Sequence, residues 1–219
     1  MIKYSKKCHI NSLLKRGSIR IGTLHEYRNC EYTEGIHDNS EGLKRVNLTL
    51  NGTLDFSLGD SRTQNIKNNF FGGVFNNISN GTVFEGDGCS FSREVSYPNS
   101  FIFCTSSQRV DLVPKVFGYD AGVKIINPEK FIDVISKEMK AKYGAKLSYF
   151  DEIKYKSKEE EWNGINFGEN PAIYKDESFS YQSEIRAIWT MPNHSLGLVA
   201  PTILQIPELK KYVHPIQLG

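Results

Sequence analysis

The chain has 219 residues, of which 39% are apolar and 24% are charged, a composition typical of a soluble globular protein with a sizeable core. A net charge of +2 gives no electrostatic reason to expect nucleic acid, and the absence of a run of about 18 apolar residues argues against a membrane span. Residues 1–7 lack the apolar centre of a signal peptide, so we expect a cytoplasmic protein with one domain over residues 1–219.

The N-terminal segment predicts a strand, a helix and a second strand. The first strand covers residues 2–5, and a helix over 10–15 ends at Gly17, a residue that readily adopts positive φ. Residues 18–24 alternate between apolar and polar side chains, which predicts the second strand. Residues 29–42 are rich in Glu, Asp, Asn and Gly without a period, which indicates a loop.

A hairpin is expected next. Asn51-Gly52 separates the alternating segments 45–50 and 53–57, and both residues tolerate the positive φ that a tight turn requires. Residues 60–99 are rich in Asn and Gly but also contain several phenylalanines, whereas disordered segments contain few aromatics. We therefore expect an Asn/Gly/Phe-rich insertion or a lid over residues 60–99.

The second half gives clearer signals. Asn127 is expected to cap a helix that has Pro128 at its first position and ends at Gly144. Its apolar face would consist of Phe131, Ile132, Ile135 and Met139. Strands are expected at 100–104, 121–126, 146–150, 152–155 and 184–190, with a charged turn at 156–161. Strands outnumber helices without alternating with them, which predicts an α+β fold of mixed, mainly antiparallel sheets with a few packed helices.

The sequence contains no strong metal or nucleophile motif. The four cysteines (Cys8, Cys30, Cys89 and Cys104) have no C-x-x-C spacing, so we expect reduced, mostly buried thiols and no zinc site. The glycine pairs lack the strand-Gly-helix context of a dinucleotide loop.

A polar row on the last long strand is the most informative feature. Strand side chains alternate between faces, so Gln182, Glu184 and Arg186 are expected on one face. Such a row forms either a solvated surface, where the two charges would make a weak cross-strand ion pair, or the floor of a site.

Two other polar features complete a three-part pattern with this row. They are a basic residue on an early strand, Arg20 or Lys3, and the hydroxyl cluster Thr105-Ser106-Ser107. A basic side chain binds phosphate, small hydroxyls orient a ribose or an amide, and a carboxylate stabilises an oxocarbenium-like transition state. The alternatives are a solvated face for Arg20 and a helix cap for the hydroxyls.

Phe103-Cys-Thr-Ser-Ser107 together with Gln182-Ser-Glu184 resembles the Arg–Ser–Glu signature of ADP-ribosyltransferases. The resemblance implies a split sheet, NAD as the substrate, a catalytic Glu184 and a Gln182 that positions the acceptor. It also implies that Thr105, Ser106 and a basic residue bind the cofactor; in several members this basic residue is on the first strand, here Lys3 or Tyr4. Tyr119, in Phe117-Gly-Tyr119, would stack on the cofactor, with core packing as the alternative.

A second resemblance covers more of the chain. The layout is similar to an uncharacterised bacterial domain family that is widespread in mobile and defence-associated gene clusters and carries an aromatic-x-x-Glu-x-Glu-x-Arg strand. The matching segments are 2–4, 13–17, 19–28 with Asp38 and Glu41, 103–107, 117–123 and 179–186. Phe179 replaces the usual Trp, and Gln182 replaces the first Glu. This resemblance implies a fold more than a reaction.

The sequence supports two functional hypotheses. The first is an NAD-dependent ADP-ribosyltransferase or NAD glycohydrolase that acts in a bacterial defence or toxin context, with a nucleotide as ligand and a macromolecule as a further acceptor. The second is a non-catalytic module of a defence or toxin–antitoxin system that senses a ligand or partner. If Lys3 or Arg20 meets Ser106 and Glu184 in one cleft, the enzyme hypothesis gains support.

Overall fold

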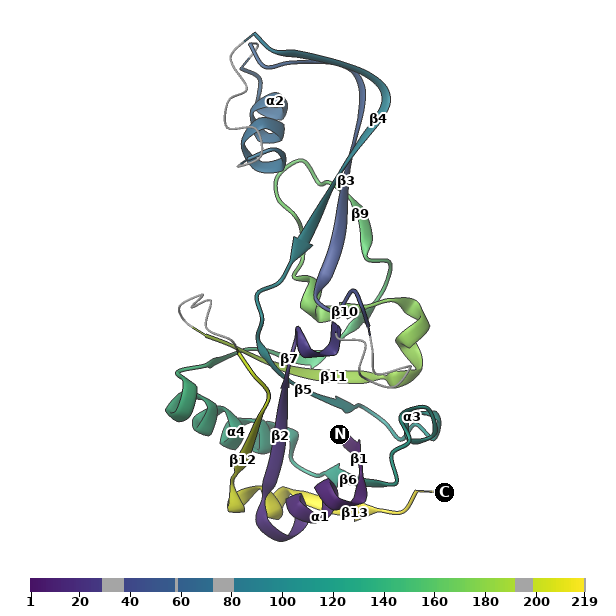
Figure 1. The fold of residues 1–219 in the computed structure, drawn as a ribbon, viewed down its shortest axis with the longest axis vertical. Helices are drawn as coiled ribbons and strands as arrows, with labels where there is room; N and C mark the ends of the chain where they lie inside the picture. Colours follow the sequence, from purple (N-terminus) through teal and green to yellow (C-terminus); the bar gives the residue numbers. More distant parts are fainter. Residues whose placement is uncertain (29–37, 58, 73–80, 192–198, 219) are drawn as a thin grey trace. The chain divides into compact units, whose positions relative to one another are not determined.

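A computed structural model describes residues 1–28, 38–57, 59–72, 81–191 and 199–218 and has an α+β fold with mainly antiparallel strands, which confirms the predicted class (Figure 1). The chain divides into two compact units. The first contains Met1–Gly42, Pro98–Lys156 and Ala172–Gly219, and the second contains Leu43–Tyr97 and Ser157–Pro171. The assignment of residues 1–219 to a single domain stays a prediction.

The first unit contains most of the elements. Its strands are β1 (Ile2–Ser5), β2 (Ser18–Thr23), β5 (Phe101–Ser106), β6 (Ala121–Ile125), β7 (Lys146–Glu152), β8 (Lys154–Tyr155), β10 (Tyr174–Lys175), β11 (Glu184–Thr190), β12 (Thr202–Gln205) and β13 (Val213–Ile216). Its helices are α1 (Lys7–Arg16), α3 (Leu112–Phe117) and α4 (Pro128–Tyr143), with 3-10 turns η1 (Glu26–Arg28), η4 (Glu177–Gln182) and η5 (Pro207–Tyr212). The further 3-10 turn η3 (Pro171–Ile173) begins at the last residue of the second unit.

Local sequence signals place the two main helices of this unit. Helix α1 begins at Lys7, three residues earlier than expected, and ends at Gly17, which has φ +69°. A Cβ at Gly17 would lie 2.0 Å from the carbonyl oxygen of Ile206, so close packing as well as φ requires glycine there. Helix α4 has the predicted bounds, and its expected apolar face is buried in the core.

Replacing Asn127 by alanine is expected to lower the free energy of unfolding by about 1 kcal/mol. The Asn127 side chain accepts a hydrogen bond from the backbone N–H of Lys130 at 3.1 Å, which satisfies one of the N–H groups that have no partner within the helix. Urea unfolding measures the loss. Asn127→Asp keeps the acceptor and should retain most of the stability; equal losses in both variants would contradict the capping role.

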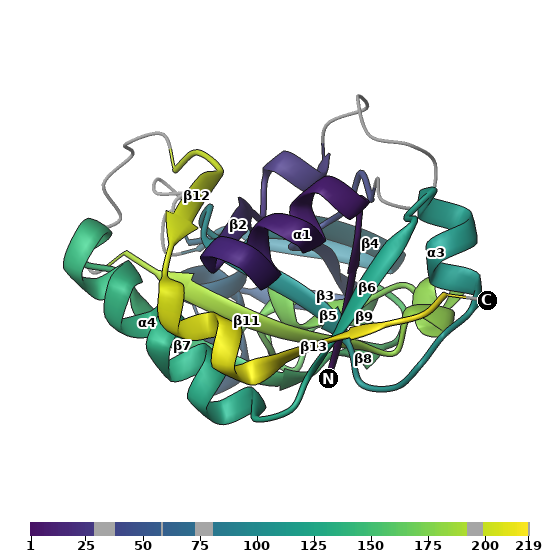
Figure 2. The same ribbon diagram turned by 90° about the horizontal axis from the view of Figure 1, so that it is seen from below.

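The main sheet of the first unit is built around β5. Strand β11 runs antiparallel along one edge of β5, with Glu184 opposite Ser106 and Trp189 opposite Phe101, and β7 continues the sheet beyond β11. The other edge receives two strands at its two ends: β2 pairs at Phe101 and Ile102, and β1 pairs at Ser106. Strands β6 and β13 extend the sheet from β1, and β12 extends it from β2. Helices α1 and α4 contribute apolar side chains to the core of this unit. Figure 2 shows the two helices beside the strands of this sheet.

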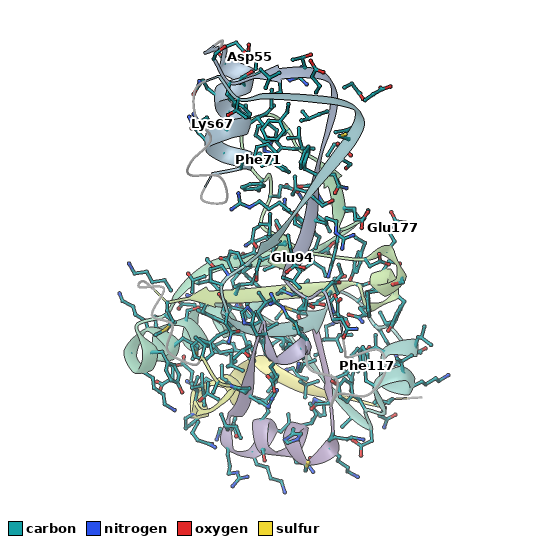
Figure 3. All side chains as sticks on the ribbon, turned by 45° about the horizontal axis from the view of Figure 1, so that its top comes forward. Asp55, Lys67, Phe71, Glu94, Phe117 and Glu177 are labelled. Carbon is teal, nitrogen blue, oxygen red and sulfur yellow. The ribbon has the colours of Figure 1, made fainter. Side chains whose placement is uncertain are left out.

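The second unit is a ribbon with helical turns. Strands β3 (Leu43–Asp55) and β4 (Val83–Ser96) pair antiparallel along their length (Figure 1), and β9 (Glu159–Glu161) adds to β3 in parallel. Helix α2 (Ser61–Asn65) leads into the π-helical turn η2 (Ile66–Phe70). An aromatic cluster forms the core of this unit and includes Phe71, which is labelled in Figure 3, and its edge-on neighbours Phe70 and Phe91.

Two sequence predictions for this unit are wrong. Asn51-Gly52 does not form a hairpin turn, because β3 continues through it; the pairing with β4 shifts register there, and Gly52 has φ +93°. Segment 156–161 is not wholly a charged turn, because 159–161 form β9, where Glu160 pairs with the buried ammonium of Lys44. Most of the expected insertion over 60–99 lies in this unit as α2, η2 and β4, and its role as a lid stays a prediction.

Candidate functional site

The sheet of the first unit splits along one edge of β5. Strands β1 and β2 attach to opposite ends of that edge, at Ser106 and at Phe101–Ile102, so the edge between them pairs with no strand of the described residues. A part-buried lysine, Lys3 of β1, reaches this gap and donates a hydrogen bond from Nζ to the carbonyl oxygen of Cys104 at 2.8 Å.

A cavity adjoins this split. It contains about 610 Å³ of empty space, including the part that is open to solvent. Its polar lining consists of Lys3, Glu41, Thr105, Ser106, Lys175, Gln182, Glu184 and Arg186, and its aromatic lining of Tyr4, Tyr27, Phe117 and Tyr119. Polar groups that converge on a partly aromatic wall are typical of a binding site.

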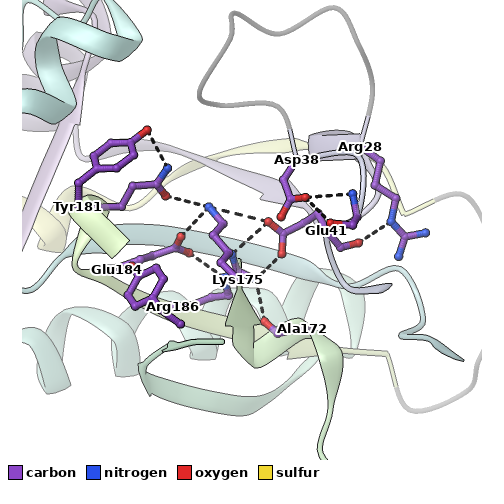
Figure 4. A network of polar contacts seen from close by, with 11 residues as sticks. Arg28, Asp38, Glu41, Ala172, Lys175, Tyr181, Glu184 and Arg186 are labelled. Atoms are coloured by element: carbon purple, nitrogen blue, oxygen red, sulfur yellow. Dashed lines mark hydrogen bonds and ion pairs between the residues drawn. The ribbon is translucent and has the colours of Figure 1, made fainter. Parts of the chain in front are cut away.

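Four buried charges form the floor of this cavity (Figure 4). The Arg186 guanidinium donates from Nε to Glu184 at 2.7 Å and from its two terminal nitrogens to Glu41 at 2.7 and 3.3 Å. It also donates to the carbonyl oxygen of Ala172 at 2.7 Å. Lys175 lies 2.9 Å from the other oxygen of Glu184 and 3.9 Å from Glu41. We call Glu41, Lys175, Glu184 and Arg186 the buried quartet.

Opposite charges within the quartet favour the ionised forms of Glu184, Lys175 and Arg186. Burial alone would raise the pKa of Glu184, but Arg186 and Lys175 outweigh burial and hold that pKa well below its usual range. Burial alone would lower the pKa of Lys175, and Glu184 and Glu41 raise it instead. The alternative of an ion pair on an exposed sheet face is therefore wrong, since Arg186 is fully buried.

A left-handed residue brings Gln182 to the same cavity. Gln182 is the last residue of η4 rather than part of the strand, so the expectation of one continuous polar row is wrong. Ser183 has φ +42° between them, an uncommon conformation for a residue other than glycine. Its carbonyl oxygen accepts a hydrogen bond from the N–H of Ser107 at 2.7 Å. The turn leaves the Gln182 side-chain carbonyl oxygen 2.8 Å from Lys175 Nζ.

The hydroxyl cluster also reaches the cavity. Thr105 and Ser106 are buried at the end of β5 and line the cavity. They do not cap a helix, because the next helix, α3, has Asp111 at its N-cap position. Phe117 and Tyr119 pack edge to face with ring centres 5.4 Å apart, and both line the cavity as well.

Arg20 lines a second cavity, which Lys3 lines as well. This cavity is lined by Arg20, His9, Ser5 and Ser18, and it shares Lys3, Tyr27, Ile102, Cys104 and Tyr119 with the first. The Arg20 guanidinium forms an ion pair with Glu26, and its side chain is 40% exposed. Of the two proposed basic residues, only Lys3 lines the same cavity as Ser106 and Glu184.

Sequence reasoning missed two members of the quartet. Glu41 appeared only as part of the second family resemblance, and Lys175 had no assigned role. Glu41 comes from a point 145 residues away from Arg186 in the chain, and no local pattern indicates such a contact. For Lys175 the sequence offered one signal: it is a single lysine followed directly by the acidic residues Asp176 and Glu177.

The cysteines differ from expectation. Cys8 and Cys89 are exposed and Cys104 is half-buried, so the prediction of mostly buried thiols is wrong for the described residues; Cys30 lies outside them. Burial raises the pKa of the Cys104 thiol to about 12. Within the described part of the chain, no group of three or more His, Cys, Asp or Glu side chains is arranged to hold a metal ion.

Comparisons with protein-family models, with curated proteins and with solved structures each found no match. Among the described helices, none is both long and apolar enough to cross a membrane. A function for this chain therefore has to be inferred from the geometry of the cavity.

Proposed function

We propose that the protein cleaves the bond between nicotinamide and ribose in NAD, as an NAD glycohydrolase or an ADP-ribosyltransferase. The observation that supports this proposal most is the convergence of Lys3, Ser106 and Glu184 on one cavity. Cations, hydroxyls and a carboxylate on one wall suit a ligand that carries phosphate and ribose groups.

Glu184 would stabilise the transition state electrostatically. The lowered pKa keeps this carboxylate negative, so it would neither donate nor accept a proton during the reaction. As the bond to nicotinamide breaks, the leaving ring takes the bonding electrons, and positive charge develops on the ribose. A buried carboxylate that is already oriented stabilises that charge.

The remaining groups would hold the substrate and the acceptor. Gln182, with its side-chain carbonyl oxygen 2.8 Å from Lys175 Nζ, would position the attacking water or acceptor. This nucleophile would release its proton to solvent water as it bonds to the ribose carbon. Thr105 and Ser106 would hydrogen-bond to the ribose, and Tyr119 would stack on a ring. Either Arg20 or Lys3 would bind phosphate. A role in bacterial defence or as a toxin rests on the second family resemblance alone.

A second candidate is a non-catalytic module that senses a ligand or a partner. The specific observation in its favour is that each Glu184 oxygen already contacts a cation, Arg186 at 2.7 Å and Lys175 at 2.9 Å. A carboxylate so well compensated also makes a rigid floor for a binding cavity. On this proposal the protein binds a nucleotide and leaves it intact.

The experiment that tests these proposals incubates the purified chain with NAD and measures released nicotinamide by chromatography and binding by calorimetry on the same sample. We expect binding and steady release of nicotinamide, with ADP-ribose either free or attached to an added acceptor. Binding without release would support the sensing module instead. If the dinucleotide neither binds nor reacts, cleavage of NAD and sensing of this nucleotide are both ruled out.

A further inference from the structure

Strand β7 is the longest of the strands at the ends of the sheet in the first unit. It pairs with β11 on one side, and in the ranges that the structure describes no strand pairs with its other side. The other end strands, β12 and β13, have four residues each, whereas β7 has seven. Strand β13 also contains Pro215, which has no backbone N–H. Because short strands and proline make poor templates for pairing, β7 is the edge best suited to another chain.

The backbone of β7 has hydrogen-bonding groups that point away from β11. In an antiparallel pair, opposite residues either bond to each other or both point away, and the two kinds alternate. The carbonyl oxygen of Glu184 accepts a hydrogen bond from the N–H of Ile153, so every second residue of β11 from Glu184 onward faces β7. The β11 residues between them, which lie opposite Phe150 and Leu147, face β5 instead. The N–H and C=O groups of Phe150 and Leu147 therefore point to the free edge.

A bulge at Ser148 determines which side chains of β7 share a face. Ser148 is an extra residue in the pairing with β11, so simple alternation is interrupted there. The residues opposite Leu147 and Phe150 are two apart on β11 and belong to the apolar core, which places both side chains on the core face. Lys146 and Asp151 lie opposite β11 residues of the other face and therefore share that face.

This arrangement makes β7 complementary to a second copy of itself. A two-fold axis at residues 148–149 would pair the two β7 strands antiparallel, with Lys146 opposite Asp151 of the second copy. The same axis sets Leu147 opposite Phe150 of the second copy, so that their outward backbone groups can bond to each other. Each pair joins side chains on one face, opposite charges in one case and apolar groups in the other. The two bulges lie opposite each other, so neither shifts the register.

The side chains that would make these contacts are accessible. Leu147 is a large apolar residue with 41% of its surface exposed. Lys146 and Asp151 are exposed, and neither forms an ion pair with another residue that the structure describes. A second copy would cover the leucine, provide each charge with an opposite charge and bond the open backbone groups.

We propose that the protein forms a two-fold symmetric dimer through β7, which joins the sheets of the two copies into one. The partner that this edge fits is thus a second copy of the same chain. The inference does not rest on the proposed function, because no residue of 146–151 lines either cavity described above.

Sedimentation equilibrium of the full chain, with single charge reversals, tests this pairing. The unaltered protein should show a monomer–dimer equilibrium. Lys146→Asp and Asp151→Lys each turn two attractive pairs of the dimer into two repulsive ones, so each should weaken the dimer about 10-fold or more. Lys130→Asp is the matched control, because it makes the same charge change at an exposed position on α4 and should alter the dimer Kd less than about 2-fold.

An equimolar mixture of the two reversed proteins tests the register itself. A dimer with one copy of Lys146→Asp and one of Asp151→Lys has opposite charges at both pairs, so the mixture should recover most of the affinity that each variant loses alone. Circular dichroism checks that each variant folds. A protein that stays monomeric at every concentration, a dimer that the single reversals leave unchanged, or a mixture that does not recover affinity would each overturn the proposal.

Discussion

Replacing Arg186 by methionine is expected to lower the free energy of unfolding by about 3–5 kcal/mol, the usual cost of breaking a buried ion pair by removing one partner. The variant leaves Glu41 and Glu184 in the interior, with Lys175 as the remaining cation of the quartet. It also leaves the carbonyl oxygen of Ala172 without the hydrogen bond from Arg186. Denaturant unfolding monitored by circular dichroism measures the loss.

A surface arginine in the same unit provides the matched control. Arg109 pairs with Asp111 at 3.0 Å, and the two side chains are 51% and 73% exposed. Arg109→Met removes the same functional group and should lower the free energy of unfolding by less than about 1 kcal/mol. Equal losses for Arg109→Met and Arg186→Met would show that the quartet is not a buried, ionised network. A second replacement, Glu41→Gln in the Arg186→Met background, removes the excess negative charge and should recover part of the loss.

The pH dependence of this loss follows from the lowered pKa of Glu184. A carboxyl group whose pKa is lower in the folded than in the unfolded chain stabilises the fold above its unfolded pKa. That contribution disappears as the pH falls toward the folded pKa. The difference between the wild type and Arg186→Met should therefore be full at pH 7 and should shrink as the pH falls below about 4.5, the ordinary value for a glutamate.

The sequence predicted those parts of the fold that local chemistry determines. Helix α4 has both predicted ends because Asn127, Pro128 and Gly144 each act on the adjacent backbone. The prediction of a hairpin turn at Asn51-Gly52 was wrong for a related reason. A residue that tolerates positive φ suits a tight turn, but it suits a β-bulge equally well. Gly52 adopts that φ inside a continuous strand, and the Asn51 side chain accepts a hydrogen bond from Gly88 N–H at 3.0 Å.

The candidate site was predictable only in part, for the same reason. Alternation along β11 correctly placed Glu184 and Arg186 on one face, since both line the cavity. It could not show that this face is buried, because the charges that allow burial come from Glu41 and Lys175, on other segments. Gln182 lies at the cavity because the left-handed Ser183 turns the backbone between η4 and β11, not because side chains alternate along a strand. Parallel pairing, as of β9 with β3, likewise depends on segments far apart in the chain.

Glu184→Gln is expected to lower the rate of nicotinamide release by about 100- to 1,000-fold, the usual effect of removing one preorganised electrostatic contact from a transition state. The variant keeps the size of the side chain but loses the negative charge that would face the developing positive charge on the ribose. Initial rates at saturating NAD, measured on protein whose folding is checked by circular dichroism, give this factor. Affinity for NAD should change much less than the rate, because on the proposed function the carboxylate would act mainly in the transition state.

Glu41→Gln separates catalysis from the stability of the network. It removes the same charge from the same quartet, 2.7 Å from Arg186, and should destabilise the fold to a comparable extent. Because Glu184 keeps its charge and its contacts with Lys175 and Arg186, release of nicotinamide should fall by less than about 10-fold. If both variants are folded and lose activity equally, Glu184 supports the network and has no separate role in the reaction. If only Glu184→Gln loses nicotinamide release, the result would support a position of the Glu184 carboxylate at the ribose. The two variants remove the same charge from the same quartet, so stability alone could not explain the difference in rate.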